Sequence, residues 1–402
     1  MVPNGWSVFP LDQVSKIIDC KHRTPKYVKE GIPLVSPGTI KWGPIDLDSP
    51  TKRVTNEEYA SLMDHCSVDI GDLVLSRNQS VGIASYVDKS EPFVLGQDTV
   101  LVKPNGCDAS YLFYNLQSVN TQRTVFKLAG GSTFSRINLG EIRKLKSIYP
   151  PLPEQRKIAQ ILSTWDRGIA TTEKLIDASK QQKKALMQQL LTGKKRLIDP
   201  ETGKAFEGDW DQVSFGDIAK LSSKKYDPNK MESSFPCIEL EHLAQDSGMI
   251  LGTVESKQLS SIKSVFHSGD VLFGKLRPYL KKYAHPKFSG VCSTEIWVLK
   301  AQKAVISEYL YQFIQTNIFI SEANKSAGSK MPRADWGLVS ELILKIPCHQ
   351  EQQKIASVLT AADKEIELLE AKFAHLKQEK NALMQQLLTG KRRVKVPETE
   401  VA

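Results

Sequence analysis

Cysteine is scarce and scattered along this chain of 402 residues. The six cysteines, at positions 20, 66, 107, 237, 292 and 348, include no Cys-x-x-Cys pair. Zinc knuckles and disulfide frameworks need closer and more regular spacing, so we interpret all six as reduced thiols. Cys20 with His22 and His65 with Cys66 are near neighbours, but neither pair has the spacing of metal ligands. The sequence therefore predicts no metal site.

Long apolar runs are also missing. No segment approaches the roughly 18 uninterrupted apolar residues of a membrane span. The first residues, MVPNGWSVFPLDQV, lack the basic start and apolar run of a secretory signal. We expect a cytoplasmic protein that makes no contact with a membrane.

The motifs of common enzyme classes do not occur. The sequence has no phosphate-binding loop ending in Gly-Lys-Ser/Thr, no Gly-x-Gly-x-x-Gly, no Gly-x-Ser-x-Gly and no His-Glu-x-x-His. A metal-dependent nuclease needs carboxylates and a lysine around a metal, and Asp246 with the Glu-x-Lys at 255–257 has that spacing. Asp363 with the Glu-x-Lys at 370–372 has it too, so the pattern arises easily by chance. We expect that the chain is not an enzyme.

Composition and charge suit an ordinary folded protein. Hydrophobic residues make up 41% and charged residues 25% of the chain, and its length allows two or three domains. The net charge is +9, but residues 150–204 alone carry 11 basic and 6 acidic residues. Because most of the excess lies in this one stretch, net charge alone does not indicate that the remaining parts bind nucleic acid.

One stretch of sequence occurs twice. ALMQQLLTGK stands at 185–194 and again at 382–391, a shift of 197 residues. The same shift, without a gap, relates Glu154-Gln155 to Glu351-Gln352. Farther upstream it relates Gly131-Ser132 and Arg136 to Gly328-Ser329 and Arg333. Such self-similarity predicts two copies of one structural unit, each with a variable domain and a nearly constant helix.

The repeat predicts six segments. These are a domain at 1–149, a long helix at 150–196, a linker at 197–208, a second domain at 209–346, a second long helix at 347–393 and a tail at 394–402. In the domains, short apolar or alternating runs predict strands at 72–76, 93–95, 99–102, 271–273 and 296–299, with helices at 56–63, 109–118 and 307–316. Because these elements do not alternate as in βαβ units, the predicted fold class is α+β.

The two long helices carry a coiled-coil pattern. Apolar residues recur in alternating steps of three and four, prolines precede each helix, and Thr-Gly-Lys ends it. Lys183 and Lys380 interrupt the two apolar seams and could fix their register. We expect the helices to pack on each other. The residues expected at this packing are Ile158, Leu162, Trp165, Ile169, Ile176, Leu186, Leu190, Ile355, Leu359, Ile366, Leu369, Phe373, Leu376, Leu383 and Leu387.

A cluster of basic and aromatic residues favours nucleic-acid binding. The segment 273–282 (FGKLRPYLKK) has the composition expected for contacts to phosphates and bases. Its counterpart at 77–79 offers an arginine and two amides, which suit guanine and adenine edges. Arg136 and Arg333 could contact DNA or support the backbone. The full set of expected DNA-binding residues is Lys41, Arg77, Asn78, Gln79, Arg136, Lys275, Arg277, Tyr279, Lys281, Lys282 and Arg333.

Over nearly its whole length the chain resembles the specificity subunits of type I restriction–modification enzymes. The resemblance rests on the helix starts PPLPEQRKIA and HQEQQKIA, the helix ends LMQQLLTGK, the Gly-Ser…Arg segments and residues 273–282. It implies two target-recognition domains, each reading one half of a split DNA sequence. It also implies that the two helices pack antiparallel between them as a ruler. At 76–78 the first unit has Ser-Arg-Asn where the second has Gly-Lys-Leu-Arg at 274–277, so the two should recognise different half-sequences.

The resemblance also implies partners. These are double-stranded DNA, two modification subunits that hold S-adenosylmethionine and methylate adenine, and restriction subunits that use ATP and Mg²⁺ to translocate and cleave DNA. The chain itself would hold no cofactor. Two alternatives stay open: a coiled-coil scaffold that binds no DNA, favoured by the nearly neutral domains, and a metal-dependent nuclease.

Overall fold

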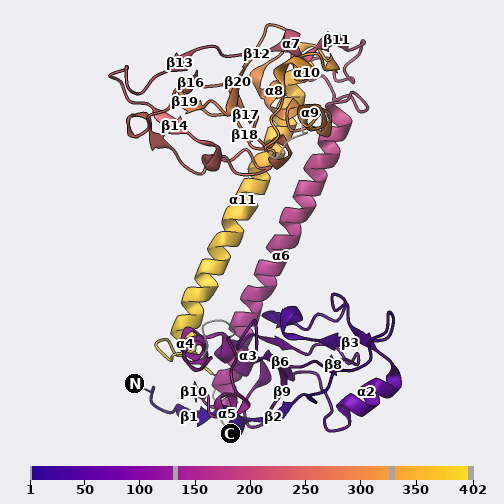
Figure 1. Ribbon diagram of the computed structural model, residues 1–402, viewed down its shortest axis with the longest axis vertical. Coiled ribbons are helices and arrows are strands. Elements are labelled where there is room, and N and C mark those ends of the chain that lie inside the picture. Colours follow the sequence, from indigo (N-terminus) through magenta and orange to yellow (C-terminus); the bar gives the residue numbers. More distant parts are fainter. Residues whose placement is uncertain (1, 130–134, 326–330, 397–402) are drawn as a thin grey trace. The chain divides into compact units, whose positions relative to one another are not determined.

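The computed structural model describes residues 2–129, 135–325 and 331–396. The chain divides into two compact units. Unit 1 comprises Met1–Glu173 together with Ala371–Ala402, and unit 2 comprises Lys174–Glu370. We call residues 1–149 domain 1 and residues 209–346 domain 2. Each unit therefore contains one domain and parts of both long helices (Figure 1).

Domain 1 is built on a five-stranded sheet of order β2-β9-β6-β7-β4 and a three-stranded sheet of order β5-β3-β8. Its first and last strands, β1 and β10, pair antiparallel and so bring the two ends of the domain together. The strands are β1 (Ser7–Pro10), β2 (Ser15–Asp19), β3 (Ile32–Val35), β4 (Gly43–Pro44), β5 (Arg53–Val54), β6 (Leu73–Ser76), β7 (Ala84–Tyr86), β8 (Val94–Leu95), β9 (Thr99–Pro104) and β10 (Lys146–Tyr149). The helices are α1 (Leu11–Val14), α2 (Asn56–Met63), α3 (Ala109–Gln117), α4 (Val119–Leu128) and α5 (Leu139–Arg143).

Domain 2 repeats this plan. Its first and last strands, β11 and β21, pair antiparallel, and the order β12-β20-β17-β18 matches β2-β9-β6-β7 of domain 1. A second sheet has the order β13-β16-β19-β14-β15. The strands are β11 (Asp211–Ser214), β12 (Ala219–Leu221), β13 (Lys225–Tyr226), β14 (Pro236–Ile238), β15 (Val254–Glu255), β16 (Lys263–Phe266), β17 (Val271–Gly274), β18 (Tyr283–Ala284), β19 (Gly290–Ser293), β20 (Ile296–Ala301) and β21 (Ile343–Ile346). The helices are α7 (Phe215–Ile218), α8 (Ser307–Phe313), α9 (Asn317–Ala323) and α10 (Trp336–Ser340).

The strands and helices predicted in the domains are confirmed, and their ends have local causes. The helix predicted at 56–63 has those bounds. The helices predicted at 109–118 and 307–316 end earlier, as α3 and α8, because Ser118 and Thr316 cap the next helices. The Ser118 hydroxyl accepts a hydrogen bond from the backbone N–H of Thr121, and that of Thr316 from Phe319, each at 3.3 Å.

The two long helices are α6 (Leu152–Leu190) and α11 (His349–Leu387), each a continuous helix of 39 residues. Both end sooner than predicted, because Gly193 and Gly390 adopt left-handed backbone angles, with φ of 71° and 69°. The predicted linker at 197–208 is an ordered turn, in which the N–H of Asp199 donates to the carbonyl of Lys204 at 2.8 Å. Of the predicted tail, residues 397–402 lie outside the described residues.

Within each unit the two helices run antiparallel. In unit 1 the start of α6 lies beside the end of α11, where Asp166 pairs with Lys380 at 2.5 Å. In unit 2 the end of α6 lies beside the start of α11, where Lys183 pairs with Asp363 at 2.5 Å. Each unit therefore combines a domain, the first part of the helix that follows it and the last part of the other repeat's helix. The repeat in the sequence is not the unit of structure.

The ends of the helices belong to the hydrophobic cores of the domains. In unit 1, Leu162 of α6 and Leu387 of α11 are buried in one cluster with residues of domain 1. In unit 2, Leu359 of α11 and Leu190 of α6 are buried with residues of domain 2. Of the remaining predicted packing residues, Ile158, Ile176 and Ile355 are buried and the others are half-buried: Trp165, Ile169, Leu186, Ile366, Leu369, Phe373, Leu376 and Leu383.

A buried glutamate joins helix and domain in unit 2. The side chain of Glu351, at the start of α11, is 0% exposed. It accepts hydrogen bonds from Nε and Nη2 of Arg196 at 2.7 and 2.8 Å and from Nε1 of Trp210 at 3.2 Å. Because Arg196 follows α6 and Trp210 begins domain 2, this one carboxylate connects three segments. We call it the unit 2 joint.

Unit 1 has the same joint, made by the two ends of the chain. Glu154, at the start of α6, accepts from Nε and Nη2 of Arg393, both at 2.7 Å, and from Nε1 of Trp6 at 3.1 Å. Arg393 also donates through Nη1 to the carbonyl of Asn4 at 2.9 Å. Arg393 follows α11, so the C-terminal segment is fixed to the first residues of domain 1.

The seam lysines also attach the helices to the domains. Nζ of Lys183 donates to Oε1 of Gln315 in domain 2 at 2.8 Å, in addition to its pairing with Asp363. In unit 1, the hydroxyl of Tyr114 donates to the Asp166 carboxylate at 2.6 Å. Burial raises the pKa of Tyr114, and the bond to Asp166 raises it further, so this hydroxyl remains a donor.

No helix in the described ranges combines the length and the apolar character that crossing a bilayer requires.

Candidate nucleic-acid interface

The predicted DNA-binding residues gather on equivalent loops of the two domains. In domain 1 the loop joins β6 to β7, and in domain 2 it joins β17 to β18. Each loop is paired with the segment that carries the repeated arginine: Asn78 forms a bridge with Arg136, and Leu276 forms one with Arg333. The Gly-Ser pairs at 131–132 and 328–329, which precede these arginines, lie outside the described residues. We call the two loops, residues 77–82 and 275–282, the strand-end loops.

Backbone strain concentrates at the strand-end loops. In the described ranges, the non-glycine residues with positive φ are Gln79, Asp98, Asp246, Arg277 and Lys281, with φ between 48° and 63°. Three of them lie on the loops. The other two touch them, since the carbonyl of Asp98 accepts from the N–H of Arg77 and the N–H of Asp246 donates to the carbonyl of Lys281. Left-handed angles are costly for Gln79, Arg277 and Lys281, and such outliers concentrate at functional sites, so the strain makes these loops the candidate site.

The loop of domain 2 presents uncommitted basic and aromatic side chains. Arg277 and Tyr279 are exposed and Lys275 is half-buried. No described residue gives these three side chains a hydrogen bond or ion pair. Lys281 and Lys282 have internal partners, because Nζ of Lys281 lies 3.3 Å from the Asp246 carboxylate and Nζ of Lys282 donates to the carbonyl of Leu240 at 2.6 Å. The first three side chains of this loop are therefore the ones available to a ligand.

The loop of domain 1 differs, because its arginine is buried. The side chain of Arg77 is 6% exposed; its Nη1 lies 2.9 Å from Oδ1 of Asp19 and its Nε donates to the carbonyl of Ile137 at 3.3 Å. This geometry does not fit the base contact that the sequence predicted for Arg77 and favours a structural role. Gln79 remains exposed and Asn78 half-buried.

Lys41 lies near the same loop. It is exposed and follows the turn Pro37–Thr39, in which a Cβ on Gly38 would lie 3.5 Å from Oε1 of Gln79. The backbone N–H of Lys41 donates to the Ser85 hydroxyl at 3.1 Å and so attaches this residue to β7.

The repeated arginines support the loops through ion pairs. Nη2 of Arg136 lies 2.7 Å from Oδ1 of Asp98, and Nε of Arg333 lies 3.0 Å from Oε2 of Glu295. Both carboxylates immediately precede an equivalent strand, β9 or β20. Of the two roles considered from the sequence, the backbone-supporting one has this direct structural basis.

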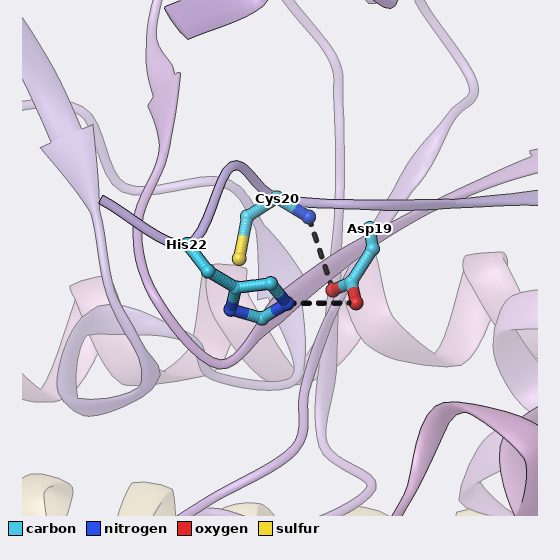
Figure 2. Close-up of side chains that lie close together, drawn as sticks. All are labelled: Asp19, Cys20 and His22. Carbon is cyan, nitrogen blue, oxygen red and sulfur yellow. Dashed lines mark hydrogen bonds and ion pairs between the residues drawn. The ribbon is translucent and has the colours of Figure 1, made fainter.

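Asp19, Cys20 and His22 lie close together at the end of β2, although their spacing predicted no metal site. Their possible ligand atoms lie within 4.8 Å of one another (Figure 2). The Asp19 carboxylate is already engaged, since it lies 3.1 Å from Nε2 of His22 and pairs with Arg77. Burial, and then the charge of Asp19, raise the pKa of Cys20. Of the three side chains, Asp19 is the one that bonds to Arg77 and supports it.

Arg77→Ala is expected to lower the free energy of unfolding by about 2 kcal/mol, because it removes the buried hydrogen bond to Ile137 and leaves Asp19 without its cation. Thermal and urea unfolding measure the loss. Arg77→Lys keeps the charge but cannot reproduce the bond from Nε to Ile137. Its free energy of unfolding should therefore lie between those of the wild type and Arg77→Ala. Unchanged stability combined with weaker DNA binding would instead support the base contact predicted from the sequence.

The nuclease-like patterns do not assemble. Asp246 pairs with Lys281 and accepts from the Tyr283 hydroxyl at 3.3 Å, while Asp363 pairs with Lys183. Within the part of the chain that the structure describes, neither belongs to a group of side chains close enough to hold a metal ion. Each of these carboxylates is instead paired with a lysine.

Comparison with known proteins is consistent along the whole chain. A family model, described as the type I restriction modification DNA specificity domain, matches residues 3–181 and 207–378. The type I restriction enzyme MjaVIII specificity subunit of Methanocaldococcus jannaschii is 24% identical, with 98% of this chain and 94% of that protein covered. The EcoDI specificity subunit of Escherichia coli is 22% identical, with 80% and 77% covered. The solved S subunit of a type I restriction-modification system from M. genitalium shares the fold, with a TM-score of 0.62, 16% identity, and 96% and 97% covered.

Proposed function

Because this chain belongs to the family of type I restriction–modification DNA specificity domains, we propose that each of its units reads one half of a bipartite DNA target. The observation that carries this proposal is the pair of strained strand-end loops at equivalent places in the two units. As a specificity subunit, the chain is not itself catalytic. Its contribution is to choose the sequence.

The two loops support reading of different half-sequences. The loop of domain 2 offers Lys275, Arg277 and Tyr279, whereas the loop of domain 1 offers the amides of Asn78 and Gln79. Arginine and lysine pair best with guanine, and asparagine and glutamine with adenine. The two half-targets should therefore differ in base composition near these loops.

Other subunits supply the chemistry in this proposal. Modification subunits hold S-adenosylmethionine and methylate adenine, and restriction subunits use ATP and Mg²⁺; this chain holds none of these groups. Features that support docking beside the helices are the exposed Leu175 of α6 (48%) and Leu368 of α11 (71%). A groove of about 1180 Å³ between these helices and domain 2, lined in part by Met187 and Ile366, offers further apolar surface.

Exchange of residues 1–149 for those of another family member tests the proposal. We expect one half of the methylated target to change and the other half to stay the same, because each domain recognises its half-sequence independently of the other domain. Each mismatched base pair should weaken binding by about 1–3 kcal/mol, so the old half-site loses its methylation. Sequencing of methylated adenine in cells that express the chain with its modification subunits gives the target directly.

Exchange of residues 209–346 is the matched control, and it should change the opposite half. A change in both halves after either exchange would rule out independent reading. If no sequence-specific methylation depends on the chain, the scaffold alternative takes the place of this proposal.

A further inference from the structure

Helix α4 of domain 1 exposes an aromatic ring between two basic side chains. Phe126 is 82% exposed, and Arg123 and Lys127 are also exposed. Their spacing of three and four residues places all three on one side of the helix. No described residue forms an ion pair or hydrogen bond with the side chain of Arg123 or Lys127. None of the predicted DNA-binding residues lies on this helix.

The helix borders the strand-end loop of domain 1. Nε2 of Gln122 donates to the carbonyl of Gly82 at 3.2 Å, and a Cβ on Gly82 would lie 2.5 Å from Cγ1 of Val125. Gly82 closes the loop, because its N–H donates to the carbonyl of Ser76 at 2.9 Å. Only a glycine permits this close approach at a φ of 77°. Helix α4 therefore adjoins the loop that carries Asn78 and Gln79.

The stretch of sequence that contains α4 carries charge of one sign. No aspartate or glutamate occurs between residues 109 and 140, while Arg123, Lys127 and Arg136 lie in that range. A protein partner that covered Phe126 would have to supply acidic groups for both free cations. A duplex supplies them along its whole length, since each phosphate is an anion. The chemistry of α4 therefore fits a polyanion with apolar edges.

The equivalent helix of domain 2 lacks this set. At the shift of 198, Arg123 corresponds to Ser321 and Phe126 to Asn324. Lys325, which corresponds to Lys127, pairs with Glu322 at 2.7 Å. In domain 2 the uncommitted cations lie on the strand-end loop instead. In domain 1 the strand-end loop has no exposed basic side chain, because Arg77 is buried. The adjoining helix α4 provides exposed basic side chains instead.

We propose that α4 is a duplex-DNA contact surface of unit 1, in which Arg123 and Lys127 bind phosphates and Phe126 packs against a sugar or a base edge. Aromatic and apolar side chains make such contacts in DNA grooves, and basic side chains fix the position of the protein on the backbone. The inference rests on the proposed function, because it assigns a further part of the same interface.

The test uses the full-length chain copurified with its modification subunits and a fluorescent DNA duplex of random sequence. The double variant Arg123→Ala/Lys127→Ala should flatten the plot of log affinity against log salt concentration by about two, one for each lost phosphate contact. Arg143→Ala/Lys144→Ala is the matched control. It removes the same charge from exposed positions at the end of α5 in the same domain and should leave the slope unchanged.

Phe126→Ala should weaken binding roughly tenfold with no change in slope, because it removes an apolar contact and no charge. Its thermal unfolding should match that of the wild type, since the ring is 82% exposed and contributes little to the core.

The outcomes separate this inference from the proposed function. If the wild type binds DNA with a steep salt dependence and the α4 double variant matches its control, α4 is not a contact surface and the proposed function stands. If the variants bind DNA normally but no longer copurify with modification subunits, α4 is a protein-docking face and the inference is overturned. If the wild-type complex shows no salt-dependent binding, the proposed function fails, and this inference with it.

Discussion

Arg196→Ala is expected to lower the free energy of unfolding by about 3 kcal/mol, because it leaves a buried carboxylate without its cation. The side chain of Glu351 is 0% exposed and would keep one donor from the joint, Nε1 of Trp210. Arg196 is 24% exposed, less than Arg393, so water reaches its position less easily, and most of the desolvation cost of Glu351 appears as lost stability. Urea unfolding followed by tryptophan fluorescence measures the change, since Trp210 lies in the joint.

Arg393→Ala is the matched variant in unit 1, and its expected loss is smaller, about 1 kcal/mol. The arginine is 46% exposed and Glu154 is 5% exposed, so solvent can partly replace the lost cation. The order of the two losses is the decisive result. Equal losses of stability, or a larger loss for Arg393→Ala, would show that burial of the glutamate does not determine how much each joint contributes to stability.

Removal of matched segments from both helices is expected to shorten the unspecified spacer of the DNA target. Deletion of residues 171–177 and of their repeat equivalents 368–374 takes out one heptad from each helix and so preserves the apolar seam. Seven helical residues rise about 10 Å, and base pairs are stacked at about 3.4 Å, so the spacer should shorten by about three base pairs. Sequencing of methylated adenine reports the new spacing together with the two half-sequences.

Deletion of residues 171–177 alone is the control. It should abolish specific methylation, because the unequal helices can no longer satisfy both seam pairs, Lys183 with Asp363 and Lys380 with Asp166. The half-sequences themselves should survive the paired deletion unchanged. A normal spacer in that variant would disprove the ruler function of the helices.

The sequence predicted the repeat, the two long helices and the α+β class because each leaves a local pattern. Near-identity over the helices reveals the duplication, and steps of three and four apolar residues reveal the seam. The caps are similarly local, since Gly193 and Gly390 each take the left-handed angle that ends a helix. What remained hidden was which helix end joins which domain. That choice depends on contacts between residues far apart in the chain, such as Glu154 and Arg393.

The candidate site was predicted less well for the same reason. Arg77 looked like a base-reading side chain until folding brought Asp19, 58 residues away, beside its guanidinium. The contact between Arg77 and Asp19 forms because β2 and β6 belong to one sheet. The residues next to Arg77 in the sequence give no sign of this contact. The positive φ angles of Arg277 and Lys281 could not be predicted from the sequence either, because arginine and lysine rarely adopt such angles. The cluster at 273–282 was found because its composition alone is informative.

The two joints also differ in when they can form during synthesis. In the unit 2 joint, Arg196, Trp210 and Glu351 have all been synthesised once the chain reaches the first residues of α11. The unit 1 joint brings Arg393 to Asn4, a separation of 389 residues. Its core also needs Met384 and Leu387 beside Trp6. Domain 1 is therefore the first to be synthesised and the last to be completed, and until the end of α11 has packed against it an apolar face stays uncovered. A released chain truncated before residue 384 should expose that face to chaperones, whereas unit 2, which ends at Glu370, has all of its residues and should be closed.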